Sequence, residues 1–194
     1  MSREWDMRTG VLATFVAAAA LSLGGCTSTY QQRETSGTET SSVRLDPSKG
    51  VFVSVTADGR LGGKTYGGTG QLVAQKTAAS FSRYARRVET GGSPTSSRVE
   101  LLAATHKAGA GYLVVPTISH WEQRATEWSG IPSRVSIGLA IIDAETGLEV
   151  RSSLLESRSA IMTFVRPSTD QLAQHLLDEN ISELYGVRVV PPSQ

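Results

Sequence analysis

The chain has 194 residues, and its 19 Lys and Arg nearly balance its 18 Asp and Glu, which leaves a net charge of +1. Nucleic acid is therefore not an expected partner, because there is no excess of cations to neutralise its phosphates. A single cysteine excludes an internal disulfide, so the fold must be held together by its hydrophobic core.

The first 25 residues are typical of a bacterial signal peptide that ends in a lipobox. The apolar segment 11–23 is 13 residues long, shorter than the ~20 that a membrane-spanning helix needs. It runs into Leu23-Gly24-Gly25-Cys26, the order of residues at which a signal of this type is cut. In a lipobox the cysteine is acylated on its thiol and becomes the mature N-terminus. The alternative is a free cysteine buried behind a short apolar helix.

This pattern predicts that Cys26 carries the lipid, with acyl chains such as palmitate holding the protein on the membrane. Two or more acyl chains anchor a protein firmly without help from basic residues. Thr27 follows the cysteine, and a residue other than Asp at this position resembles the sorting pattern of lipoproteins sent to the outer membrane. The expected location is the cell envelope, at the outer membrane and facing the periplasm.

The remaining 169 residues divide into a polar stretch, a globular domain and a short tail. Residues 26–48 are mostly Ser, Thr, Gln, Glu and Gly, which bury too little apolar surface to offset the entropy of ordering. They are expected to form a flexible tether. Residues 49–187 are expected to form one α/β domain, and residues 188–194 a loose tail.

The first elements of the domain alternate between strand and helix patterns. The β-branched run 51–55 predicts a strand. Apolar residues recur at three- and four-residue spacing over 71–88, which predicts a helix that Thr69 can cap. Residues 88–90 predict a second, short strand.

A second helix and a central strand follow. Ser97 and Glu100 have the spacing of a capping box, and the helix that they open is expected to end at Gly109. Residues 111–119 are apolar on both faces at first, which predicts a central strand. Pro116 lies inside this run, so its nitrogen is expected to face away from a partner strand or to sit at a bulge.

The last third of the domain predicts a hairpin and a helix. Residues 134–142 alternate apolar and polar side chains, residues 143–147 predict a tight turn, and residues 148–159 return as the partner strand. Leucines and Ile181 recur at helical spacing over 169–185. The predicted fold class is α/β, a mixed sheet with helices packed on it, parallel among the early strands and antiparallel in the late hairpin.

The motifs for nucleotide and metal binding are incomplete. Gly62-Gly63-Lys64-Thr65 resembles the end of a phosphate-binding loop, but Asp58 stands where the first glycine is needed and two glycines follow instead of a helix. The three histidines are far apart in the sequence and have no cysteine partner for zinc. We therefore expect no nucleotide, cofactor or metal site.

Two of the three tryptophans flank a charged segment, which is the most unusual part of the sequence. Trp121, Glu122, Arg124, Glu127 and Trp128 combine large aromatic and charged side chains, as interface anchors do, and are the candidate partner-binding residues. The alternative is a structural role, with the Trp rings covering the end of the sheet and the Glu and Arg side chains pairing between strands.

Residues 112–116, 120–122, 124–130 and the turn at 143–147 resemble an uncharacterised family of proteobacterial lipoproteins, catalogued as a domain of unknown function. The resemblance covers about residues 50–186, and the string 124–130 is its most specific part. It implies no catalytic residue, because the family has no assigned activity. The order of elements is more loosely similar to the periplasmic α/β domains of the curli-secretion lipoprotein and of the lipoprotein activator of a peptidoglycan synthase.

The sequence therefore predicts a membrane-anchored envelope protein that acts as a non-catalytic module in the periplasm and binds an envelope partner or a second copy of itself. The alternative is a hydrolase of an envelope polymer that uses Glu122 and Glu127 as its carboxylates. The two hypotheses differ in whether these carboxylates line a concave pocket or lie on a flat surface.

Overall fold

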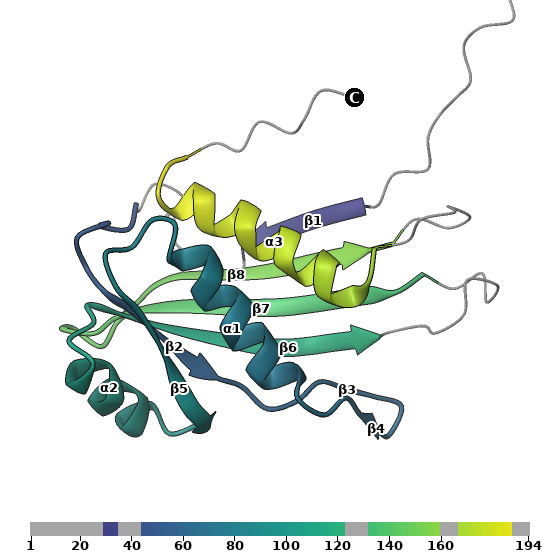
Figure 1. Ribbon diagram of the computed structural model, residues 1–194, viewed down its shortest axis with the longest axis horizontal. Coiled ribbons are helices and arrows are strands. Elements are labelled where there is room, and N and C mark those ends of the chain that lie inside the picture. Colours follow the sequence, from purple (N-terminus) through teal and green to yellow (C-terminus); the bar gives the residue numbers. More distant parts are fainter. Residues whose placement is uncertain (1–28, 35–43, 123–131, 160–166, 188–194) are drawn as a thin grey trace, which may run out of the picture.

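The computed structural model describes residues 29–34, 44–122, 132–159 and 167–187. Six strands form a mixed sheet in the order β1-β8-β7-β6-β2-β5, and β3 and β4 form a separate small hairpin (Figure 1). The strands are β1 Thr29–Glu34, β2 Val51–Val55, β3 Arg60–Leu61, β4 Lys64–Thr65, β5 Val88–Pro94, β6 Tyr112–Glu122, β7 Arg134–Asp143 and β8 Glu149–Arg158. The helices are α1 Thr69–Phe81, α2 Arg98–Lys107 and α3 Thr169–Leu184. The predicted α/β class is confirmed.

The strand directions follow from the connections. β2 is parallel to both β5 and β6, because α1 and α2 form the crossovers that parallel strands require. β6, β7 and β8 form an antiparallel meander, with the turn after Asp143 joining the last two strands. The pairing between β6 and β2 ends at Val114, two residues before Pro116. Pro116 therefore lies in a part of β6 that is not paired with β2.

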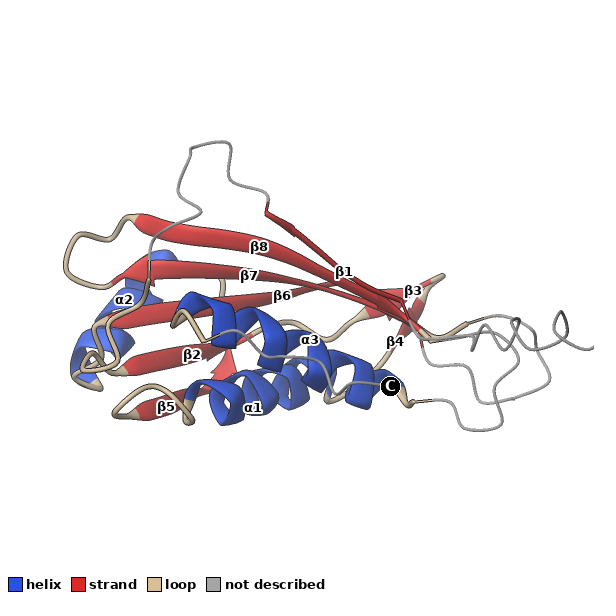
Figure 2. Cartoon of the chain, turned by 90° about the horizontal axis from the view of Figure 1, so that it is seen from above, coloured by secondary structure: helices blue, strands red, loops and turns tan. Residues whose placement is uncertain are grey.

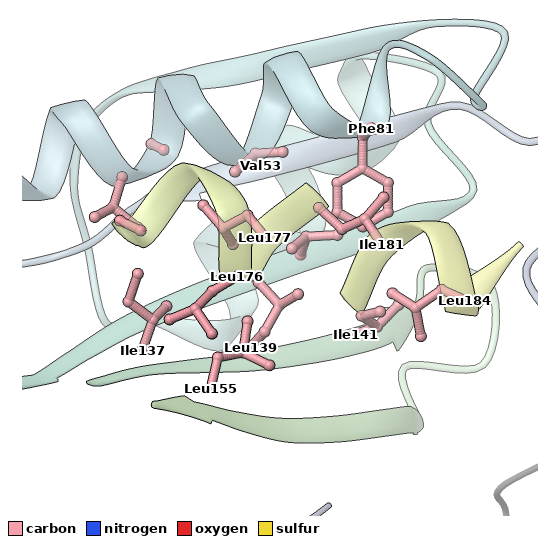
Figure 3. Packing of buried hydrophobic residues seen from close by; sticks show 14 of the residues in the cluster. Val53, Phe81, Ile137, Leu139, Ile141, Leu155, Leu176, Leu177, Ile181 and Leu184 are labelled. Carbon is pink, nitrogen blue, oxygen red and sulfur yellow. The ribbon is translucent and has the colours of Figure 1, made fainter. Parts of the chain in front are cut away.

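The helices cover the two faces of the sheet unequally. α1 and α3 lie next to each other on one face, whereas α2 packs against the opposite face near one end of the molecule (Figures 1 and 2). The larger core lies between the sheet and the two helices α1 and α3, and it includes Phe81, Leu177 and Ile181 of the helices and Ile137 and Leu155 of the sheet (Figure 3). A smaller core under α2 contains, among other residues, Phe52, Leu101, Leu113 and Ile142.

Helix α3 matches its predicted pattern. The Ser168 hydroxyl accepts a hydrogen bond from the Gln171 backbone N–H, and the Gln171 side chain accepts one from the Ser168 N–H, so the helix opens with a capping box. All of the predicted inward residues are buried: Leu172, Leu176, Leu177, Ile181 and Leu184. The spacing of these residues and the cap together explain why this segment is a helix.

Asp58, and not Thr69, caps helix α1. The Asp58 carboxylate accepts hydrogen bonds from the backbone N–H groups of Gly68 (3.1 Å) and Gly70 (2.8 Å), which have no partner within the helix. The Thr69 hydroxyl instead donates to the Tyr66 carbonyl and accepts from the Gly59 N–H. Gly70 is required for this close approach, because a Cβ there would lie 2.0 Å from the Thr56 carbonyl oxygen.

Helix α1 also ends earlier than its apolar spacing predicts. It stops at Phe81, and the chain then turns, with the N–H groups of Tyr84 and Ala85 both donating to the Phe81 carbonyl. Tyr84 stacks on Tyr185 with ring centroids 5.2 Å apart, and Ala85 is buried. The apolar spacing after Phe81 therefore reflects the packing of residues that follow the helix, and not a longer helix.

Two parts of the predicted tether 26–48 are not free chain. β1 pairs antiparallel with β8 along its full length, so residues 29–34 form an edge strand of the sheet. Leu45 is 3% exposed, and its backbone N–H donates to the Leu184 carbonyl at 2.8 Å, so the ordered domain begins before residue 49. The prediction of a flexible tether is therefore wrong for these residues. The predicted signal peptide 1–25, Cys26 and the tail 188–194 lie outside the described residues.

Replacing Asp58 with alanine is expected to lower the free energy of unfolding by about 1 kcal/mol at neutral pH, because two N–H groups lose their acceptor. These hydrogen bonds, with that from Gly70 first, hold the pKa of Asp58 below its ordinary value near 3.8. The stabilisation is therefore complete above that value and is lost as the pH falls through the lower pKa of the folded state. Urea unfolding of both proteins between pH 3 and 7 measures it. Asp58→Asn keeps one acceptor and should lose less, whereas a loss for Asp58→Ala that is the same at pH 3 and pH 7 would contradict the role of the charge.

Candidate functional site

Trp121 belongs to the hydrophobic core. It is 2% exposed and packs under α1 and α3 with the residues of the larger core. Its Cβ lies against Gly59, where a Cβ would approach it to 2.7 Å, so glycine is needed for this contact. Its indole N–H has no hydrogen-bond partner among the described residues. The prediction that Trp121 is a surface anchor for a partner is therefore corrected: this side chain covers the inner face of the sheet.

Glu122, the next residue of β6, lies on the opposite face. Its carboxylate oxygen is 3.2 Å from Nε2 of His120, which precedes it by two residues and therefore shares its face. Its backbone carbonyl accepts a hydrogen bond from the Thr169 hydroxyl at the start of α3. The structure thus separates Trp121 from Glu122. Arg124, Glu127 and Trp128, the other three predicted binding residues, lie outside the described residues.

The face of β6, β7 and β8 that points away from α1 and α3 is termed the open face. Its side chains alternate along each strand with the core residues Ile137, Leu139 and Leu155. In its middle, Thr117 is exposed beside Gly138 and Leu154, which are half-buried. The open face consists of Thr117, His120 and Glu122 of β6, Arg134, Ser136, Gly138 and Ala140 of β7, and Ser152, Leu154, Glu156 and Arg158 of β8, whereas Val115 on the same side of β6 packs against the core under α2.

One end of the open face carries a row of paired positions across four strands. Glu122 of β6 is opposite Arg134 of β7, Arg134 is opposite Arg158 of β8, and Arg158 is opposite Thr29 of β1. Opposite charges at neighbouring positions stabilise strand pairing, so Glu122 next to Arg134 has a structural role as well. This set, Glu122, Arg134, Arg158 and Thr29, is termed the end row.

The opposite end of the sheet holds an ion pair that sequence reasoning missed. Nζ of Lys49 donates to the Asp143 carboxylate at 3.0 Å and lies 5.1 Å from the centre of the Tyr112 ring. This hydrogen bond raises the pKa of Lys49 and, with backbone N–H groups of the turn, lowers the pKa of Asp143. The pair ties the start of β2 to the β7–β8 turn, which is a structural role. Residues 49 and 143 are brought together only by the topology of the sheet. The sequence pattern therefore does not predict this ion pair.

The described ranges hold no cluster of three or more His, Cys, Asp or Glu side chains arranged to bind a metal ion. None of the helices in this part of the chain is both long enough and apolar enough to cross a membrane.

The sequence matches the model of the family described as "Domain of unknown function (DUF4823)" over residues 43–184. The chain belongs to this family. The expectation of an uncharacterised family is thereby confirmed, and the DUF4823 match begins at residue 43, in agreement with the burial of Leu45. No curated protein matches the sequence.

Several solved structures are similar to this chain at low sequence identity. The PelC dodecamer from Paraburkholderia phytofirmans is 15% identical, has a TM-score of 0.61, and is matched over 83% of this chain and 100% of that chain. A PelC variant from the same organism has a TM-score of 0.60, 15% identity and coverage of 83% and 99%. Lipoprotein GNA1162 from Neisseria meningitidis is 14% identical, with a TM-score of 0.42 and coverage of 70% and 97%. At 15% identity, the likeness to the two PelC structures concerns the fold alone.

Proposed function

We propose that the protein is an envelope lipoprotein, anchored in the outer membrane through Cys26, which binds a protein partner through the open face and catalyses no reaction. The observation that carries the binding role is the unequal cover of the sheet. α1 and α3 cover one face along the strands, whereas α2 packs against the other face at one end only (Figure 2). A sheet face with exposed and half-buried side chains is suited to contact with another folded surface.

The composition of the open face supports a protein partner. On the open face, the middle of β7 carries only small residues, namely Ser136, Gly138 and Ala140. Thr117 and Leu154 flank Gly138 at the centre and supply a polar and an apolar contact. Charged groups lie toward the end row. Apolar and small residues at the centre with charges at the rim are the usual arrangement of a protein interface.

A second copy of this chain is the first partner to test. The similar PelC structure is a dodecamer, and the match covers all of the PelC chain. Native mass spectrometry of the purified protein would separate self-association from binding to a different protein.

The segment 123–131 remains a predicted part of the binding surface on sequence grounds, through Arg124, Glu127 and Trp128. The hydrolase alternative needs Glu122 and Glu127 to act together. The structure favours binding over this alternative, because Glu122 is a strand residue whose carboxylate already contacts His120 on the same strand, as in a structural pair. Binding is therefore the function that we favour.

Thr117→Arg is expected to abolish capture of the partner in a pull-down from intact crosslinked cells while leaving the melting temperature unchanged. Thr117 is exposed, so a long cation at this position obstructs docking without disturbing the core. Gly138→Arg should act in the same way, because a Cβ at Gly138 makes only ordinary contact with Thr117, at 3.6 Å.

Val99→Arg is the matched control. Val99 is 79% exposed on α2, away from the middle of the open face, and its replacement should leave capture intact. Equal capture by wild type, Thr117→Arg and Gly138→Arg would contradict binding through the open face. Trp128→Ala and Arg124→Ala, compared in the same pull-down, test whether the segment 123–131 takes part.

A further inference from the structure

We infer that β1 fixes the domain on the bilayer with the end row facing the lipid headgroups, so that the protein has a defined orientation at the membrane. The inference deepens the proposed function and rests on its lipid anchor at Cys26. Its partner is a lipid surface, and its basis is the pairing of β1 with β8.

The chain between the anchor and the sheet is short. Cys26 precedes Thr29 by three residues, and three residues reach at most ~11 Å when fully extended. Thr29 is held opposite Arg158 by the register of β1 and β8. An acylated Cys26 therefore keeps Thr29, the β1 member of the end row, within about 11 Å of the point where its acyl chains enter the bilayer.

Exposed cations lie at the same end of the molecule as the end row. The β3–β4 hairpin is at the same end of the molecule as the start of β1 (Figures 1 and 2). Gly59, which directly precedes β3, packs on Trp121. Trp121 is adjacent in sequence to Glu122 of the end row, so the hairpin starts close to this row. Arg60 and Lys64 of the hairpin and Arg158 of the end row are exposed cations. Basic residues close to an anionic membrane surface are attracted to it.

The β7–β8 turn lies at the opposite end of the sheet from the end row. β7 has 10 residues, so the β7–β8 turn is ~30 Å from the end row at about 3.3 Å per residue. Leu148, at this turn, is 67% exposed. If residues 26–48 were one flexible tether, both ends would reach the membrane equally, because about 20 free residues span about 25 Å on average. Pairing of β1 removes most of that freedom.

The experiment compares the two ends in the full-length acylated protein, reconstituted into vesicles of phosphatidylethanolamine and phosphatidylglycerol. Thr65→Cys places a fluorescent label on the exposed β4, and Leu148→Cys places the same label on the far turn. Cys26 is the only native cysteine and its thiol carries the lipid, so each new thiol is labelled alone. Quenching by a lipid with a nitroxide on its headgroup then reports how near each label lies to the surface.

The expected result is strong quenching at position 65 and little at position 148. Inserting a Gly/Ser spacer of about 20 residues between Ser28 and Thr29 should reduce the quenching at position 65 to the level at position 148, because the end row is then no longer held near the anchor. Equal quenching at both positions of the vesicle-bound protein, or no effect of the spacer, would overturn the inference while leaving the anchor intact. Failure of the acylated protein to stay on the vesicles would overturn the anchor, and the inference with it.

Discussion

Trp121→Ala is expected to lower the free energy of unfolding by about 3–5 kcal/mol, because it leaves a cavity where the largest fully buried side chain of the described core had been. A loss of this size is a large part of the 5–15 kcal/mol by which domains of ordinary size are stable. Urea unfolding followed by circular dichroism measures it.

Trp121→Phe is the matched control for this effect. Phenylalanine keeps most of the apolar volume and removes the indole N–H, which has no partner among the described residues, so the loss should be much smaller than for alanine. A Trp121→Ala protein with wild-type stability would show that the indole ring is not part of the core. It would also restore Trp121 as a candidate surface anchor.

Cys26→Ser is expected to move the protein from the membrane to the soluble fraction and to block removal of the first 25 residues. The cysteine thiol is the group that a lipobox signal acylates before cleavage, and serine offers no thiol. Fractionation of cells with immunodetection of the full-length and processed forms measures both effects. A substitution of Ser28 with alanine, two residues away, should change neither.

Unchanged membrane fractionation of Cys26→Ser would contradict the lipid anchor. Comparison of inner- and outer-membrane fractions of the wild-type protein tests the sorting predicted from Thr27. Presence in the inner membrane alone would contradict the outer-membrane location and leave the anchor in place.

Elements with both a periodic apolar pattern and a local stop signal could be predicted from the sequence. α3 has its leucines at helical spacing and its cap at Ser168, and the β7–β8 hairpin has alternating side chains on both sides of the turn at Asp143. In these segments the interactions that define the element lie within the element or next to it. Sequence alone therefore carries the information.

β1 could not be predicted, because nothing in residues 29–34 distinguishes a strand from a polar linker. Its order comes from backbone hydrogen bonds to β8, more than a hundred residues later in the chain. Asp58 was missed as a cap for a similar reason. It caps α1 from ten and twelve residues before the N–H groups that it binds, across the β3–β4 hairpin.

The candidate site was predicted only in part. Trp121 and Glu122 lie beyond the predicted strand 111–119. Their separation onto opposite faces follows from the extension of β6 to Glu122, since neighbouring residues of a strand point to opposite faces. The sequence does not reveal that α1 and α3 pack on the same face, which is the fact that buries Trp121 and leaves Glu122 on the open face. Which face of a sheet is covered depends on the crossovers and thus on the whole topology.

The central claim, binding of a protein partner through the open face, is tested most directly by photocrosslinking from single sites in intact cells. A photoreactive amino acid at Thr117, in the middle of the open face, is compared with the same group at Val99 on α2. A discrete crosslinked product is expected from position 117 and none from position 99. No product from position 117, or the same product from both positions, would contradict the central claim.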